Sequence, residues 1–196
     1  MKMKIILLIL GIIAILFILS QLYFMSSQRN IEQYSFEVLE TYDEIEIRQY
    51  EASLVTSVQL SSNDYKKSSS KGFSILAGYI FGGNDKNEKI AMTSPVSMTL
   101  KDSTTMMFLV PKKYSKENLP TPNDASIEFK NVPAKKVAAI SFGGWANDAK
   151  INLYKRKLIA ALDSKGIGYT NSFSFLGYNA PVEVFNRKNE IIVELE

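Results

Sequence analysis

The sequence contains no cysteine and no histidine in its 196 residues. The lack of cysteine excludes disulfide bonds and thiolate nucleophiles, and the lack of histidine excludes imidazole bases and imidazole metal ligands. A Ser-His-Asp triad is therefore impossible, and a zinc site would need an all-oxygen ligand shell, which is unusual for that metal. Any catalysis would have to use the remaining polar side chains or a bound cofactor.

The chain also lacks a strong excess of charge. Its formal net charge is +3, and Lys2 and Lys4 near the N-terminus supply two of these charges. The densest other cationic runs are residues 112–113 and 155–157, and the second lies on the polar side of a predicted helix, as solvated charges usually do. Because no basic surface emerges from this pattern, we predict no nucleic-acid partner.

A long apolar segment opens the chain. Ile5 to Leu19 is interrupted only by Gly11, and residues 22–25 extend the run to about 21 residues, which matches the hydrocarbon core of a bilayer. Secretory signal peptides have shorter apolar cores of about 7–15 residues, and no small-x-small cleavage site follows here. We predict an uncleaved transmembrane signal anchor over residues 1–25, with a cleaved signal peptide as the alternative.

The flanking charges predict how the anchor is oriented. Lys2 and Lys4 precede the segment and only Arg29 follows it closely, so the positive-inside rule places the N-terminus in the cytoplasm. We therefore predict a single-pass protein of the cytoplasmic membrane, with residues 26–33 as a polar tether. The folded domain, residues 34–196, would lie on the outer side, periplasmic or extracellular.

Beyond the tether, the apolar periodicity alternates between two and 3.6 residues, which is typical of an α+β domain with antiparallel strands. One helix is predicted from an N-cap at Asn63 or Asp64 to the Gly82-Gly83 stop, and another from Asn147 or Asp148 to Gly166. Strands are predicted at residues 35–39, 44–50, 53–60, 91–100, 105–110, 126–130, 135–142, 172–178 and 190–195, with a polar turn at 186–189.

The order of these elements repeats. Pro95-Val96 follows the first predicted helix as Pro181-Val182 follows the second, which indicates an internal pseudo-repeat. Two strand-strand-helix-strand-strand halves would form a distorted antiparallel β-barrel with both helices outside. The seam between the halves would be a hydrophobic cleft.

Four blocks of sequence carry a family resemblance. They are Glu46–Tyr50, then Gly72, Phe73, Leu76, Tyr79, Ile80, Asn84 and Lys86 leading into Lys89–Val96, then Ser141–Trp145, and finally Gly177–Val182 with Asn186–Glu190. Lys89–Val96 by itself predicts only a buried strand with a bulge or edge at Pro95. Together, in this order, they closely resemble the SOUL haem-binding protein family over about residues 34–196. The resemblance implies a barrel of two similar halves that binds haem or another tetrapyrrole without catalysis, as a carrier, buffer or sensor.

The chain departs from the family at Gln49, where some members carry a histidine proposed to bind the haem iron. The remaining possible iron ligands are Tyr50 or a methionine (Met92, Met98, Met106 or Met107), and we expect that no protein group ligates the iron. Lysines near the rim would pair with the propionates. The candidate haem-binding residues are Gln49, Tyr50, Lys66, Lys67, Lys71 and Met92, and no catalytic or metal-binding residue is assigned.

Other interpretations of the same residues stay open. The methionines would also serve as core filler, and the three lysines as a solvated helix face. Arg48 would form a cross-strand charge pair, and Trp145 is expected to plug the core rather than cover a pocket. Competing functions are a hydrolase or other enzyme in the same cleft, with Glu183 or Tyr178 taking part, and a binding module for another flat hydrophobic ligand or a protein partner.

Overall fold

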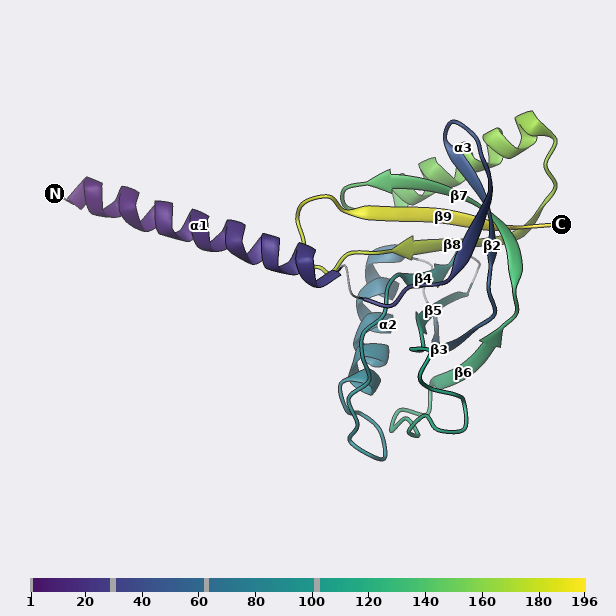
Figure 1. The fold of residues 1–196 in the computed structure, drawn as a ribbon, viewed down its shortest axis with the longest axis horizontal. Coiled ribbons are helices and arrows are strands. Elements are labelled where there is room, and N and C mark those ends of the chain that lie inside the picture. The colour runs from purple at the N-terminus through teal and green to yellow at the C-terminus, as the bar shows by residue number, and fades with distance from the viewer. Residues whose placement is uncertain (1, 29–30, 62–63, 101–102) are drawn as a thin grey trace.

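The computed structural model describes residues 2–28, 31–61, 64–100 and 103–196, and it shows an α+β domain preceded by a long helix (Figure 1). The helices are α1 (Lys2–Gln28), α2 (Tyr65–Ile80) and α3 (Asp148–Lys165). The strands are β1 (Phe36–Thr41), β2 (Ile45–Tyr50), β3 (Ser53–Leu60), β4 (Val96–Thr99), β5 (Thr104–Leu109), β6 (Ile127–Val132), β7 (Lys135–Gly143), β8 (Tyr169–Gly177) and β9 (Lys188–Leu195).

The nine strands of the described residues form one sheet in the order β1-β2-β7-β9-β8-β4-β5-β3-β6, and every neighbouring pair is antiparallel. The α+β class with a large antiparallel sheet is therefore confirmed. Within the described residues no pairing joins β1 to β6, so these two strands are the sheet edges. Closure of the sheet into a barrel stays a prediction.

Both domain helices begin and end where their sequence signals predict. Asp64 accepts a hydrogen bond from the Lys67 amide at 2.8 Å, and Asn147 accepts one from the Lys150 amide at 2.9 Å, so each caps a helix N-terminus. Gly166 ends α3 in the left-handed conformation at φ 64°. The alternative N-cap, Asn63, lies outside the described residues.

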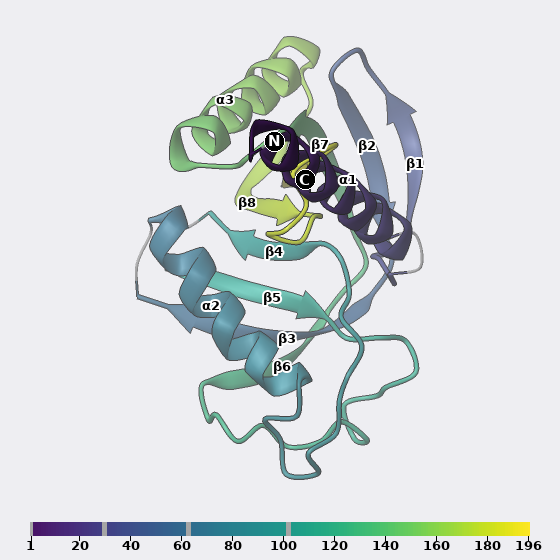
Figure 2. The same ribbon diagram turned by 90° about the vertical axis from the view of Figure 1, so that its left-hand side faces the viewer.

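Helices α2 and α3 cover one face of the sheet (Figure 2). Alternate residues of each strand point to opposite faces. On the helix-covered face, Ile45, Ile47 and their neighbours join the main core with residues of α2 and α3. On the other face, here called the second face, a smaller buried cluster contains Tyr50, Val137, Ala139, Leu176 and Ile192. Residues are therefore buried on both faces of the sheet, so the second face can also hold a site.

Two predicted elements differ from the observed ones. The strand expected at residues 91–100 covers only Val96–Thr99, because the Thr93 and Ser94 hydroxyls donate to the carbonyls of Leu109 and Tyr178 and Pro95 has no amide to donate. The polar turn expected at residues 186–189 is the end of a longer connection, residues 178–187, between β8 and β9.

Helix α1 projects from the domain and contains a segment, Met3–Gln21, that is long and apolar enough to cross a membrane (Figure 1). Its apolar side chains are exposed, which a core helix of a soluble domain would not show. Length and composition alone fit an anchor and a signal sequence equally. The helix continues to Gln28, into the range predicted as tether, and residues 29–30 lie outside the described part.

Candidate functional site

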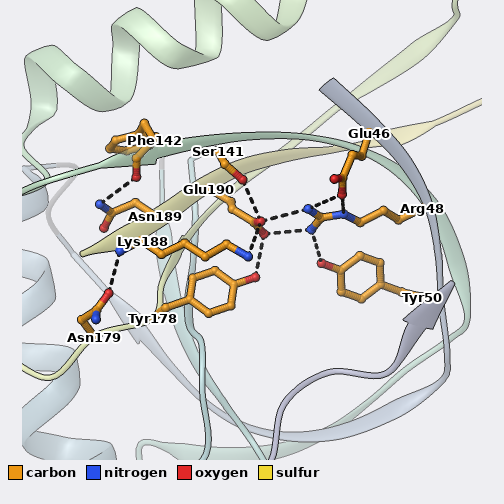
Figure 3. Close-up of polar contacts among 10 residues, drawn as sticks. All are labelled: Glu46, Arg48, Tyr50, Ser141, Phe142, Tyr178, Asn179, Lys188, Asn189 and Glu190. Atoms are coloured by element: carbon orange, nitrogen blue, oxygen red, sulfur yellow. Dashed lines mark hydrogen bonds and ion pairs between the residues drawn. The ribbon is translucent and has the colours of Figure 1, made fainter. Parts of the chain in front are cut away.

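The second face carries a buried ion pair at its centre. Arg48 on β2 and Glu190 on β9 lie on either side of β7, and their side chains form two parallel hydrogen bonds of 2.9 Å each (Figure 3). Arg48 is 3% exposed and Glu190 is 0% exposed. The predicted cross-strand partner of Arg48 is thus present, and its bidentate geometry is the strong form of an Arg–carboxylate contact.

Further groups complete the hydrogen bonding of the Glu190 carboxylate. The Tyr178 hydroxyl donates to it at 2.6 Å, the Ser141 hydroxyl donates at 3.0 Å, and the Lys188 ammonium lies 3.0 Å away. Arg48 also contacts Glu46 at 2.7 Å. We call these residues the Arg48–Glu190 cluster; Figure 3 shows its side chains converging from β2, β7 and β9.

The environment fixes the charge of the central carboxylate. Burial alone would raise the pKa of Glu190, but the hydrogen bonds and charge of Arg48 outweigh burial and lower this pKa to about 2. Burial and the nearby Glu190 charge raise the pKa of Tyr178. At neutral pH the cluster therefore holds an ionised carboxylate and a neutral tyrosine.

This state decides what the cluster can do chemically. A carboxylate with a pKa near 2 is a poor general acid or base at neutral pH, since a catalytic pKa lies close to the working pH. Glu183, the carboxylate considered from the sequence, is 2% exposed and accepts hydrogen bonds from Asn179 at 2.8 Å and from the Ala180 amide at 2.9 Å, within its own loop. Both carboxylates have the contacts of structural groups.

Aromatic rings connect the cluster to a pocket. Phe36 stacks on Tyr50 with ring centroids 4.9 Å apart and also lies 4.5 Å from the Arg48 guanidinium carbon. Tyr34 meets Tyr50 edge-on with ring centroids 6.0 Å apart. Tyr50 accepts a weak hydrogen bond from Arg48 at 3.4 Å, and burial raises its pKa. The ion pair thus holds one wall of the pocket in place.

The pocket has a volume of about 230 Å³ and opens on the second face. Its apolar walls are Tyr34, Tyr50, Met107, Leu176 and Ile192, and hydroxyl groups come from Ser53, Ser97, Thr99, Ser172 and Ser174. Lys135 contributes a cationic side chain, which lies 3.8 Å from Glu194. Apolar walls with a few polar groups are typical of small-molecule sites.

The predicted haem-binding residues do not meet at one place. Tyr50 lines the pocket, whereas Gln49, its neighbour on β2, points to the opposite face of the strand. Lys66, Lys67 and Lys71 are exposed on α2, which covers the other side of the sheet. Met92 is half-buried against the main core, in the segment before β4.

Other sequence expectations are settled by burial. Met98 and Met106 are 3% and 1% exposed in the main core, as the core-filler interpretation predicts, while Met107 faces the pocket. The expectation that Trp145 plugs the core is wrong, because its side chain is 53% exposed and the Arg187 guanidinium lies 3.9 Å above its ring. Trp145 follows the turn at Gly143-Gly144, and this turn directs the chain away from the sheet.

Sequence reasoning missed Glu190 and Tyr34 as site residues. Glu190 was expected to begin a strand and to end the last family block, without a role in a site, and Tyr34 precedes the first predicted strand. A signal for the first existed in Arg48, since an arginine within an alternating apolar strand needs a buried carboxylate partner. The identity of the carboxylate that pairs with Arg48 depends on the order of the strands in the sheet.

Comparisons with known proteins agree with this architecture. Heme-binding protein 1 of Xenopus laevis is 26% identical over 154 residues, which cover 74% of this chain and 80% of that protein. Heme-binding protein 2 of Homo sapiens is 28% identical over 154 residues, covering 74% and 75%.

Among solved structures, the C-terminal domain of EcmrR superposes with a TM-score of 0.60 at 16% identity, covering 78% of this chain and 97% of that one. A hydrolase from Listeria innocua superposes with a TM-score of 0.54 at 8% identity, covering 81% and 94%. These two likenesses show the fold alone.

The family comparison covers nearly all of the domain and agrees with the four blocks of sequence described above. The profile of the SOUL heme-binding protein family matches residues 31–194. The chain belongs to the SOUL heme-binding protein family.

Proposed function

We propose that the domain binds haem or a related tetrapyrrole as cargo in the second-face pocket, without catalysing a reaction on it. The observation that carries the proposal is the pocket itself, whose walls are tyrosine, methionine and aliphatic side chains. Burying apolar area contributes about 25 cal/mol per Å² and would hold the ring by its faces. The family membership and the relatives named as heme-binding proteins support the same ligand.

The residues present fit such a ligand in part. Lys135 and the serine and threonine hydroxyls would receive propionate groups, and the aromatic wall would contact the ring. The volume of 230 Å³ is below the roughly 300–1,000 Å³ of sites that enclose drug-sized ligands, so a tetrapyrrole would enter only partly. We therefore propose a shallow site in which one edge of the ring stays exposed.

The iron would have no histidine ligand, because the sequence has none. Tyr50 and Met107 are the pocket residues among the ligands considered from the sequence. Burial raises the pKa of Tyr50, which disfavours the phenolate form that iron prefers. We propose that the protein leaves the iron unligated and recognises the shape of the ring.

A second position for the ring is the exposed surface of α2, where Lys66, Lys67 and Lys71 would contact propionates, with Gln49 and Met92 contributing elsewhere on that side of the sheet. The small pocket volume also favours a smaller flat ligand as a second candidate function. These alternatives differ in which substitutions weaken binding.

The test is a titration of the full chain in detergent micelles with haemin and with metal-free protoporphyrin IX. We expect a saturable shift of the Soret band and similar affinities for both compounds. Met107→Trp should fill the pocket and weaken binding by about tenfold or more, equivalent to about 1.4 kcal/mol, while Met107→Leu should bind as the unmodified chain does.

The triple variant Lys66→Ala, Lys67→Ala, Lys71→Ala separates the two positions. Unchanged affinity in this variant supports the pocket. Lost affinity here, together with retained affinity in Met107→Trp, would move the ligand to α2. Binding that is unsaturable or indifferent to both variants would refute specific tetrapyrrole binding, and saturable binding of only smaller flat aromatic compounds would favour the second candidate function.

We further propose that α1 is an uncleaved single-pass anchor with the domain on the outer side of the cytoplasmic membrane, and that the sheet closes as a barrel of two similar halves. The anchor is supported by contacts between α1 and the domain. The Gln21 side chain donates to the Val182 carbonyl at 3.2 Å and accepts from the Val184 amide at 3.1 Å. Removal of α1 as a cleaved signal peptide would eliminate both hydrogen bonds.

The pairing order supports the two halves. Strands β7-β9-β8 of the second half lie beside β4-β5-β3 of the first, so each half contributes the same sequence of neighbours in opposite directions. Helix α2 lies between β3 and β4 in the chain, and helix α3 lies between β7 and β8, so each helix has the same place in its half.

A further inference from the structure

The loop between β8 and β9, residues 178–187, exposes an unusual amount of apolar surface. Val182 is 52% exposed, Val184 is 44% exposed and Phe185 is 52% exposed. Trp145 lies beside this loop through its contact with Arg187 and is 53% exposed. We call these four side chains the loop apolar patch.

The loop has internal contacts that hold it in one shape. The Glu183 carboxylate accepts from Asn179 and from the Ala180 amide, and Arg187 donates to the carbonyl of Ala180 at 3.0 Å. The side-chain oxygen Oδ1 of Asn179 accepts from the Lys188 amide at 2.7 Å. Because these hydrogen bonds tie Asn179, Ala180, Glu183 and Arg187 together within the loop, its apolar side chains are displayed by a fixed scaffold.

The position of the patch is set by α1. Phe17 and Phe185 meet edge-on with ring centroids 6.4 Å apart, and the Gln21 side chain hydrogen-bonds to the backbone at Val182 and Val184. Figure 1 shows the loop beside the C-terminal end of α1. Both contacts are made by residues of the candidate membrane span, Met3–Gln21.

The contacts between the loop and α1 place the loop apolar patch at the same depth as the C-terminal end of the candidate membrane span. Phe17 precedes Gln21 by one helical turn, or about 6 Å along the axis at about 1.5 Å per residue. If α1 crosses a bilayer, Phe185 then lies beside a residue inside the apolar region, and Val182 and Val184 lie at its boundary. Leaving these side chains in water would require the lipid to withdraw from the span.

The residue types match that depth. Tryptophan is enriched at membrane interfaces because its ring is apolar and its N–H is polar, and arginine extends its charge toward headgroups while its stem stays in apolar surroundings. Arg187 above the Trp145 ring supplies this pair next to Phe185. An exposed patch of Trp, Phe and Val beside a cation is therefore suited to the lipid interface.

We infer that the loop apolar patch inserts into the bilayer that α1 spans, so that the domain rests on the membrane surface instead of swinging on a tether. The inference rests on the proposed anchor. Its ligand is the interfacial zone of the lipid itself, with acyl chains against Val182, Val184 and Phe185 and headgroups around Arg187.

Fluorescence in lipid nanodiscs tests this inference, because Trp145 is the single tryptophan of the chain. The full chain is assembled in nanodiscs of phosphatidylcholine whose acyl chains carry bromine, which quenches tryptophan on contact, and in unbrominated discs. Three variants in a Trp145→Phe background carry one new tryptophan each: Phe17→Trp on α1, Phe185→Trp in the loop and Leu39→Trp on β1. Leu39 is 41% exposed and is the matched control on the domain.

We expect loss of emission from the tryptophans at positions 17 and 185 in brominated discs, and unchanged emission from the one at position 39. The unmodified chain should lose Trp145 emission as well. Quenching at position 17 without quenching at 185 would overturn the inference and leave the anchor standing. Equal quenching at 185 and 39 would overturn it too, since contact would not be specific to the loop, and absence of quenching at 17 would remove the anchor on which it rests.

Discussion

Replacing Glu190 with glutamine should reduce the loss of folding stability at acidic pH. The pKa of this carboxyl falls from an ordinary 4.5 to about 2 in the folded protein. At about 1.4 kcal/mol per pH unit, the difference corresponds to about 3 kcal/mol of stability. Because the folded pKa is the lower one, this contribution is fully present above about pH 4.5 and is lost as the pH falls toward 2.

The assay is urea unfolding of the full chain in a non-ionic detergent, followed by circular dichroism between pH 7 and pH 2. The control is Glu128→Gln, which removes a carboxylate that pairs with Lys130 at the surface and should change stability much less than Glu190→Gln does. If Glu190→Gln loses as much stability between pH 4.5 and 2 as the unmodified chain does, the assignment of an ionised, Arg48-paired carboxylate is refuted.

The same variant carries a cost at neutral pH, because it leaves the Arg48 charge buried beside a neutral amide. Breaking a buried ion pair from one side costs about 3–5 kcal/mol. Replacing both partners, as Arg48→Met with Glu190→Leu, should restore part of that loss. Recovery is expected to be incomplete because Tyr178 and Ser141 would lose the oxygen that accepts their hydrogen bonds.

Three further substitutions test the packing and the ends of the helices, and each is measured as a change in the free energy of unfolding in urea. Gly72→Ala should cost about 1–3 kcal/mol, because its Cβ would lie 2.9 Å from Leu60 and 3.0 Å from Met106; an unchanged midpoint would show that α2 shifts freely. Asn147→Ala should cost about 1 kcal/mol by removing the α3 cap, and Asn147→Asp should retain it. Gly166→Ala should cost about 1–2 kcal/mol from the left-handed backbone alone, since nothing lies within 4 Å of the new Cβ; a cost below a few tenths of a kcal/mol would contradict this.

The elements that could be predicted from the sequence are those whose ends are encoded locally. Asp64, Asn147 and Gly166 act within one helical turn of their own position, and the observed helix ends follow them. The strand at residues 91–100 failed because its outcome depends on distant groups. Thr93 and Ser94 donate to carbonyls on β5 and beyond β8, and no local pattern announces those partners.

The candidate site was harder to predict because it forms across the sheet. Tyr50 was identified through the family resemblance, but Leu176 and Ile192 reach the same pocket only because β8 and β9 pair with each other and β8 lies next to β4. The prediction for Gln49 shows the limit most clearly. Neighbours on a strand face opposite sides, so a set containing both Gln49 and Tyr50 joins residues that the sheet separates.

The proposed contact with the membrane would favour the proposed haem binding by raising the local concentration of the ligand. A shallow pocket without an iron ligand has to hold its cargo by apolar contact, which gives modest affinity compared with a site that also coordinates the metal. Tetrapyrroles are flat and apolar, and they partition into lipid. A domain that rests on the bilayer meets them at a raised local concentration, so the same pocket is filled more fully at the membrane than it would be in solution. The proposed anchoring would then compensate for the missing histidine, and a chain freed from its anchor should keep its intrinsic affinity for haemin while losing its advantage in the presence of vesicles.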